Sequence, residues 1–240
     1  MILAKALGAL WLVFLLTCVA LFVPAGTLSW TAGWIFLLLF FGWMTVLALW
    51  LSRHDPGLLM ERLSLLKADQ PVWDRIWVLL CYALSLAWLV LISLDARRWH
   101  RLQVPLWLQL LGALLLLCAL TMIVATMRTN RFLSPLVRLQ SERGHTLVSD
   151  GPYASVRHPL YSGACLFYLG VPLFFGSWEG FACAPLFMGL LYLRAVLEER
   201  LLCRALPGYE QYMQEVPRRF LPRFSSRRQR HTSLADGKDR

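Results

Sequence analysis

Long runs of apolar residues alternate with short polar segments along this chain. Four uninterrupted apolar runs of 18 or more residues contain no charged residue: 6–23, 30–51, 76–94 and 105–127. An α-helix needs about 20 apolar residues to cross the hydrocarbon core of a bilayer. We therefore expect four transmembrane helices and predict an integral membrane protein.

A fifth apolar region, residues 160–193, is interrupted by "GSWEG" at 176–180. Glycine and serine in such a cluster break a helical pattern. The region is therefore predicted to form a hairpin of two shorter helices. The expected fold is all-α: a polytopic membrane helix bundle of four transmembrane helices and a C-terminal helical hairpin, with a polar loop before the hairpin and a short amphipathic helix after it.

Composition divides the chain into three expected parts. Residues 1–130 hold the four membrane helices and a polar loop at 52–75, and residues 131–222 hold the hairpin with the polar segments around it. Residues 223–240 are basic and lack apolar periodicity. Such a composition is typical of disorder, so this tail is predicted to be unstructured.

The distribution of charge predicts the orientation of the helices. The chain carries 24 Lys and Arg and 14 Asp and Glu, a net charge of +10. If the helices alternate in direction, 21 of the 24 basic residues fall on one side of the membrane. That side is expected to face the cytoplasm. Topology and attraction to anionic lipid explain the positive charge, so the bilayer is the expected partner and nucleic acid is not.

A polar, turn-rich segment, "DGPYASVRHPLYSG" at 150–163, leads into the hairpin. Its first three residues predict a turn, and Pro159 suits the first turn of a helix. A helix N-terminus offers unpaired N–H groups and partial positive charge to a carboxylate or phosphate. The alternative is an interfacial loop whose tyrosines belong to an aromatic belt, with His158 merely polar.

Charged residues also occur at the end of the last apolar helix, in "RAVLEERL" at 194–201. Arg194 and Glu198 are four residues apart and so share a helix face. Charges near membrane depth are functional candidates. The alternative is an ion pair between the two that closes the helix end. Glu199 and Arg200 are predicted to point elsewhere, toward solvent.

A third polar segment is predicted to form a short helix between Pro207 and Pro217. Tyr209, Tyr212 and Val216 would fall on one side of it. Such an amphipathic helix lies on a membrane surface or closes over a polar cluster.

The cysteines and the absence of several sequence motifs narrow the possible chemistry. Five of the six cysteines lie in apolar runs and no C-x-x-C pair occurs, so we expect core hydrophobes, not disulfides or a metal site. The chain has no G-x-G-x-x-G, no P-loop, no H-E-x-x-H and no G-x-S-x-G motif. Soluble-type nucleotide domains, zinc proteases and serine hydrolases are therefore disfavoured.

Three sequence blocks, in order, resemble a known family. "HTLVSDGPYASVRHPLYSG", "RAVLEERLLCRALPGYEQYMQEV" and a closing proline are similar to the catalytic half of the isoprenylcysteine carboxyl methyltransferases and the related phospholipid methyltransferases. The resemblance covers roughly residues 140–222. It implies a multi-pass membrane enzyme that uses S-adenosylmethionine without a Rossmann domain, with residues 131–222 as the catalytic region.

The resemblance also implies the roles of particular residues. Glu198 would complete the cofactor site, and Arg194 corresponds to the family's substrate-binding arginine. The polar loop would hold the cofactor on the cytoplasmic side. The implied cofactor-binding residues are Gln140, His145, Thr146, Leu147, Val148, Tyr153, His158, Pro159, Leu160, Tyr161 and Glu198, and the implied catalytic residues are Arg194 and Glu198.

The sequence defines the identity of the methyl acceptor less closely than that of the cofactor. The acidic run is shorter than in the prenylcysteine enzymes, and "LPGY" replaces their phenylalanine, glycine and acidic pair. The expected acceptor is the carboxylate of a lipid-like molecule. The alternatives are a phospholipid amine, a small hydrophobic thiol or metabolite, or no enzymatic role at all, as in a membrane scaffold or transporter subunit.

Overall fold

The computed structural model describes residues 2–63, 70–99, 102–136 and 140–221. Within these ranges the regular secondary structure is entirely helical, as predicted. The α-helices are α1 (Ile2–Ala25), α2 (Thr31–His54), α3 (Pro56–Leu63), α4 (Val72–Leu94), α5 (Leu106–Thr129), α6 (Pro159–Phe175), α7 (Trp178–Ala182), α8 (Ala184–Ala205) and α9 (Tyr209–Glu215). The predicted tail at 223–240 lies outside the described residues.

The predicted membrane helices are all present. Five segments are long and apolar enough to cross a bilayer: Ile2–Ala25, Thr31–His54, Val72–Trp99, Leu106–Thr129 and Trp178–Ala205. Helix α6 is apolar but has only 17 residues. The four predicted spans and the C-terminal hairpin, formed by α6 and α8, are therefore confirmed, and the chain is a multi-pass membrane protein.

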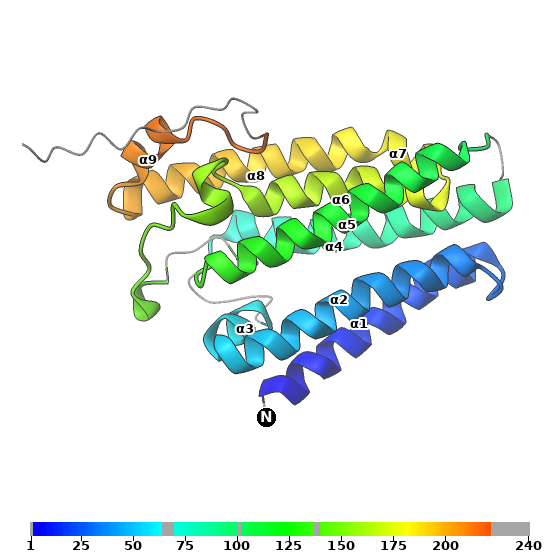
Figure 1. The fold of residues 1–240 in the computed structure, drawn as a ribbon, viewed down its shortest axis with the longest axis horizontal. Coiled ribbons are helices and arrows are strands. Elements are labelled where there is room, and N and C mark those ends of the chain that lie inside the picture. The colour runs from blue at the N-terminus through cyan, green and yellow to red at the C-terminus, as the bar shows by residue number, and fades with distance from the viewer. Residues whose placement is uncertain (1, 64–69, 100–101, 137–139, 222–240) are drawn as a thin grey trace, which may run out of the picture.

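The long helices run side by side and alternate in direction (Figure 1). One end of the bundle, which we call the loop end, holds the start of α1, helix α3, residues 130–136 and 140–158, and helix α9. The turn end holds residues 26–30, η1 (Asp95–Trp99) and α7. The polar segments identified in the sequence thus meet at one end of the bundle.

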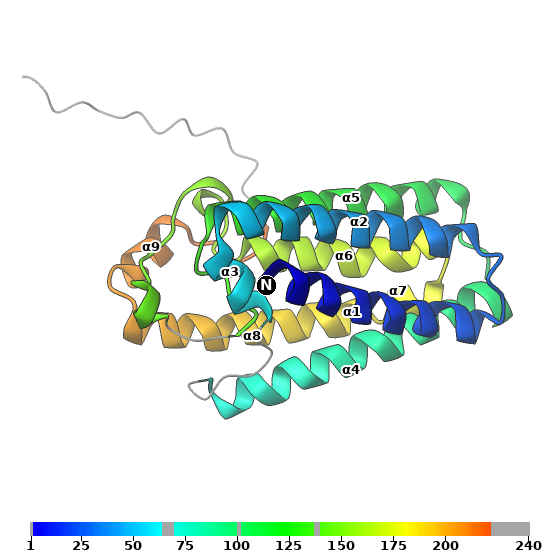
Figure 2. The ribbon, with the colours of Figure 1, turned by 90° about the horizontal axis from the view of Figure 1, so that it is seen from below.

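Helices α5 and α6 form the closest helix pair, while α4 lies at the edge of the bundle beside α1 (Figure 2). Glycines make the close approach possible. A Cβ atom on Gly112 would collide with the backbone of Phe174, and one on Gly170 would lie 2.9 Å from the Gly112 oxygen. Small residues that bring backbones together are typical of membrane helix pairs. This pair fixes the direction in which α6 leaves the loop end.

Replacing Gly170 with valine is expected to lower the melting temperature of the detergent-solubilised protein. The added Cβ would meet backbone atoms that have no room to move, and overpacking of this kind costs about 1–3 kcal/mol. Gly189→Val is the control, because a Cβ at Gly189 in α8 has no neighbour within 4 Å. Equal melting temperatures for the two variants would contradict the packing described here.

Candidate active site

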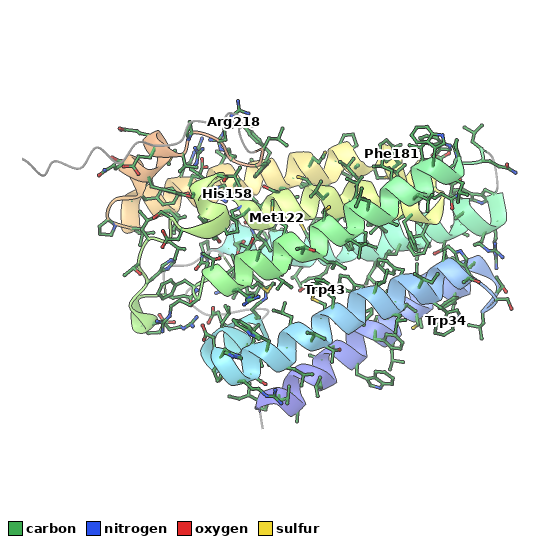
Figure 3. All side chains as sticks on the ribbon, viewed as in Figure 1. Trp34, Trp43, Met122, His158, Phe181 and Arg218 are labelled. Carbon is green, nitrogen blue, oxygen red and sulfur yellow. The ribbon has the colours of Figure 1, made fainter. Side chains whose placement is uncertain are left out.

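The turn and helix start predicted at 150–163 are both present. Residues Gly151–Ala154 form a 3-10 turn, and Pro159 is the first residue of α6. Gly151 has a φ of 56°, in the left-handed region that glycine adopts without strain. The turn directs the side chains of Tyr153 and His158 toward α8 and α9. Figure 3 shows His158 at the loop end of the bundle.

A cavity of about 350 Å³ lies at the loop end. Its size is within the range of small-molecule sites. Most of the predicted site residues line it: His145, Thr146, Leu147, Val148, Tyr153, His158, Leu160, Tyr161, Arg194 and Glu198. The structure therefore brings together residues that are far apart in the sequence.

Gln140 and Pro159 do not line this cavity. Gln140 has no exposed surface; its amide donates to the Phe132 carbonyl oxygen, and its Oε1 accepts from Arg143 at 2.7 Å. Arg143 in turn pairs with Asp55 at 3.4 Å. Gln140 thus anchors the loop to the end of α2, and Pro159 starts α6. Both residues therefore position segments that line the cavity without lining it themselves.

Glu198 presents its carboxylate to the cavity. The Tyr161 hydroxyl donates to Oε2 at 2.7 Å, and the Nδ1 atom of His158 lies 3.9 Å from the same oxygen. The rings of His158 and Tyr161 are stacked, with centroids 5.2 Å apart. Among the described residues, Oε1 of Glu198 accepts no hydrogen bond. A carboxylate can accept about four, so Glu198 has capacity left for a ligand.

Glu199 is buried, not solvated, so that prediction was wrong. Its side chain is 4% exposed and joins three cationic or hydrogen-bonding groups. Oε1 accepts from Arg157 Nε at 2.8 Å and lies 3.1 Å from His158 Nε2, while Oε2 accepts from Arg219 at 2.8 and 2.9 Å. Successive residues of a helix point about 100° apart. Glu198 therefore faces the cavity, whereas Glu199 faces Arg157 and Arg219. Arg200 is exposed, as predicted.

A C-terminal segment, residues 216–221, lies against the start of α6, and we call it the strap. Arg157 and His158 donate their backbone N–H groups to the carbonyl oxygens of Arg218 and Arg219, both at 2.9 Å. Ser162 donates its hydroxyl to the Phe220 carbonyl oxygen at 2.6 Å. Figure 3 shows Arg218 and His158 at the same end of the bundle. The strap and Glu199 together fix the position of His158.

Arg194 does not pair with Glu198 in the part of the chain that the structure describes. Its Nη2 lies 3.0 Å from Asp74 in the first turn of α4 and donates to the Pro135 carbonyl oxygen at 2.6 Å. Its Nε is buried without a hydrogen-bond partner among the described residues. The alternative of an ion pair between Arg194 and Glu198 that closes the helix end is thus contradicted, and one donor of Arg194 is left unsatisfied within the described residues.

Helix α9 closes the cavity from the outside, and its predicted amphipathic face is confirmed. Tyr209 and Tyr212 are buried against Tyr153, Leu147 and Val148. The Tyr212 hydroxyl donates to the Tyr153 carbonyl oxygen at 2.8 Å. Burial raises the pKa of Tyr212 to about 12, and it raises the pKa of Tyr153 as well. These phenols are therefore neutral at physiological pH.

The cavity also reaches into the apolar layer of the bundle. Tyr82 of α4, Tyr168 of α6 and Leu191 of α8 line this part, together with Val78 and Cys81. Tyr82 is half exposed. The cavity thus joins a polar compartment under the loops to an apolar one between membrane helices.

Sequence reasoning missed several residues at this site. Asp74, Arg62, Asn130 and Phe132 come from segments that carry no motif. Asp74 is fully buried against Arg194, and the other three line the cavity. Asn130 donates to the Tyr153 hydroxyl at 2.9 Å. An acidic residue at the start of an apolar helix was the available signal for Asp74.

Residues 107–207 match the family model described as phospholipid methyltransferase. The match begins one membrane helix before the sequence blocks that carry the resemblance. It therefore includes α5, which packs along α6, and ends just before α9.

Two known proteins are similar to parts of this chain. One is the cobalt-zinc-cadmium resistance protein CzcN of Cupriavidus metallidurans, 32% identical over 111 residues, which are 46% of this chain and 51% of that protein. The other is the protein-S-isoprenylcysteine O-methyltransferase of Schizosaccharomyces pombe, 30% identical over 95 residues, which are 39% of this chain and 40% of that protein. The chain thus spans about half of the length of the first relative and 40% of the second. The resemblance found in the sequence is confirmed, since residues 107–207 are similar to the phospholipid methyltransferase family and one relative is an isoprenylcysteine methyltransferase.

Proposed function

We propose that this chain is a membrane methyltransferase that uses S-adenosylmethionine to methylate the carboxylate of a lipid-like acceptor. The observation that carries the proposal is the single cavity with two compartments. Its polar part is lined by the residues that the resemblance implies for the cofactor, and its apolar part lies between membrane helices. Glu198 and Arg194, one helical turn apart on α8, line the same cavity.

The residues of the polar compartment fit the chemistry of this cofactor. Leu147, Val148 and Tyr153 provide apolar and aromatic surface for a nucleoside. The Glu198 carboxylate has free acceptor capacity and suits either a cationic group or a hydroxyl. S-adenosylmethionine supplies an electrophilic methyl group: an acceptor oxygen bonds to the methyl carbon while the carbon–sulfur bond breaks and leaves its electron pair on sulfur.

The protein's part in this reaction is to position the acceptor and to exclude water. An acceptor carboxylate is ionised at pH 7, because unperturbed carboxyl groups have pKa values of about 4. It therefore needs no general base. Arg194, held in place by Asp74 and Pro135, orients the carboxylate. Helix α9 and the strap cover the site from the outside, which favours alignment and a dry environment.

We place the loop end on the cytoplasmic side of the membrane. The positive-inside rule supports this orientation, since 21 of the 24 basic residues fall on that side if the helices alternate. The water-soluble cofactor would then enter from the cytoplasm and the lipid-like acceptor from the bilayer.

A phospholipid amine is the second candidate acceptor, because the matching family model is described as phospholipid methyltransferase. An amine must lose a proton before it attacks, and His158 or Glu198 would then serve as the base. The two candidates leave different products, since a methyl ester is cleaved by alkali and an N-methyl group is not.

The products can be distinguished with a radioactive methyl group. Membranes containing the protein are incubated with S-adenosylmethionine labelled in its methyl group, and the extracted lipids are then treated with base. We expect the label to be released as volatile methanol. Label that stays non-volatile after the alkali treatment would favour the amine, and absence of labelling above membranes without the protein would contradict the proposed function.

A further inference from the structure

Arg62, in the last turn of α3, lines the same cavity as Arg194. Its only hydrogen bond among the described residues is a long one, 3.4 Å from Nη1 to the Leu133 carbonyl oxygen. No carboxylate pairs with it in the described ranges, whereas Arg157 pairs with Glu199 and Arg194 with Asp74. Arg62 is thus the cavity arginine whose charge lacks a carboxylate partner in the described structure.

Helix α3 is held firmly enough to position Arg62. The Asp55 carboxylate accepts the backbone N–H of Leu58 at 2.8 Å, and Leu58 is fully buried. Glu61, next to Arg62, accepts from the Ser134 hydroxyl at 3.0 Å and is itself buried. Because adjacent helix residues point in different directions, Glu61 packs against residue 134 while Arg62 faces the cavity.

The position is costly for a lone cation. Burial lowers the pKa of Arg62, and the nearby positive charge of Arg194 lowers it further, although the hydroxyls of Tyr82 and Tyr153 oppose this. An arginine keeps its proton at physiological pH in any case. An anion between the two guanidinium groups would therefore stabilise both of them, whereas an ammonium group would be repelled.

We propose that Arg62 and Arg194 together bind the carboxylate of the methyl acceptor, and that Arg62 makes the site select an anionic acceptor over a neutral or cationic one. The proposal rests on the proposed function and narrows its substrate class. A carboxylate has about four acceptor positions on two oxygens, so it can bond two arginines at once. Arg194 orients the carboxylate and Arg62 supplies the remaining positive charge.

A pair of isosteric probes tests the proposal: N-acetyl-S-farnesylcysteine, which has a free carboxylate, and its carboxamide. Binding of each probe is measured by calorimetry on the detergent-solubilised full chain in the presence of S-adenosylhomocysteine, so that no turnover is needed. The variants are Arg62→Gln, Arg62→Lys and the control Arg53→Gln, which removes an exposed charge at the same end of the bundle. Affinity for S-adenosylhomocysteine and the melting temperature report on the fold.

We expect the wild-type protein to bind the carboxylate more tightly than the carboxamide. Arg62→Gln should weaken carboxylate binding roughly ten- to a hundredfold, as for a lost hydrogen bond to a charged group. Its affinities for the carboxamide and for S-adenosylhomocysteine should stay within about threefold. Arg62→Lys should recover part of the preference because it keeps the charge, and Arg53→Gln should match the wild type.

The outcomes distinguish a failure of the proposed role of Arg62 from a failure of the proposed methyltransferase function. A wild-type protein that binds S-adenosylhomocysteine but does not prefer the carboxylate would overturn the role of Arg62 and leave the cofactor site intact. An unchanged preference in Arg62→Gln would do the same. A wild-type protein that binds no S-adenosylhomocysteine would overturn the proposed function, and the role of Arg62 with it.

Discussion

Replacing Arg194 with leucine is expected to reduce methyl transfer by about 100-fold or more while affinity for S-adenosylhomocysteine changes only a few fold. Misplacing a reacting group by about 1 Å is enough for such a loss, and leucine offers the acceptor carboxylate no donor. Lysine at this position should recover part of the rate, because it keeps the charge but loses the planar fork. Turnover and calorimetric titration of the same preparations provide the measurements.

The control for this prediction is Asp74→Asn. It removes the charged partner of Arg194 but leaves the arginine in place, near the Pro135 oxygen that it also contacts. If Arg194 acts only through its ion pair with Asp74, both variants should lose stability and activity alike. If it orients the acceptor, Asp74→Asn should retain far more activity than Arg194→Leu.

Replacing Glu199 with glutamine is expected to destabilise the protein by about 3–5 kcal/mol, the usual cost of removing one partner from a buried ion pair. Its carboxylate joins Arg157 on the turn before α6 with Arg219 on the strap, and it also contacts His158. Loss of the charge would leave Arg157, whose side chain is 4% exposed, without its carboxylate. The melting temperature in detergent measures the effect.

Glu215→Gln is the matched control for Glu199, because Glu215 is exposed and its carboxylate contacts only Gln211 among the described residues. Exposed substitutions usually change stability by no more than about 0.5 kcal/mol. A Glu199→Gln protein that melts like Glu215→Gln would show that the strap and α6 are held together by other contacts.

The membrane helices could be predicted from the sequence because the bilayer sets a strict requirement on the length and polarity of a span. The start of α6 at Pro159 was predictable for a local reason, since proline fits the first turn of a helix. Helix α3 was not predicted. It has only eight residues, and a charged loop between two spans gives no clear periodicity.

The sequence predicted the site only in part, and the errors of that prediction have physical causes. The resemblance identified Arg194 and Glu198, which do line the cavity. It also included Gln140, which supports the loop from behind. The burial of Glu199 and Asp74 depends on Arg157, Arg219 and Arg194, partners that the fold alone brings close. Pairing across such sequence distances leaves no local pattern.

Titration of S-adenosylhomocysteine into the wild-type protein and Glu198→Gln tests whether the cavity at the loop end binds the cofactor. We expect saturable binding at a single site, weakened in Glu198→Gln by about 1.5–3 kcal/mol, the value of a hydrogen bond to a charged group. Glu210→Gln, on the exposed face of α9, should bind like the wild type. Absence of binding to the wild type at millimolar ligand, or equal affinity in Glu198→Gln, would contradict the proposed cofactor site.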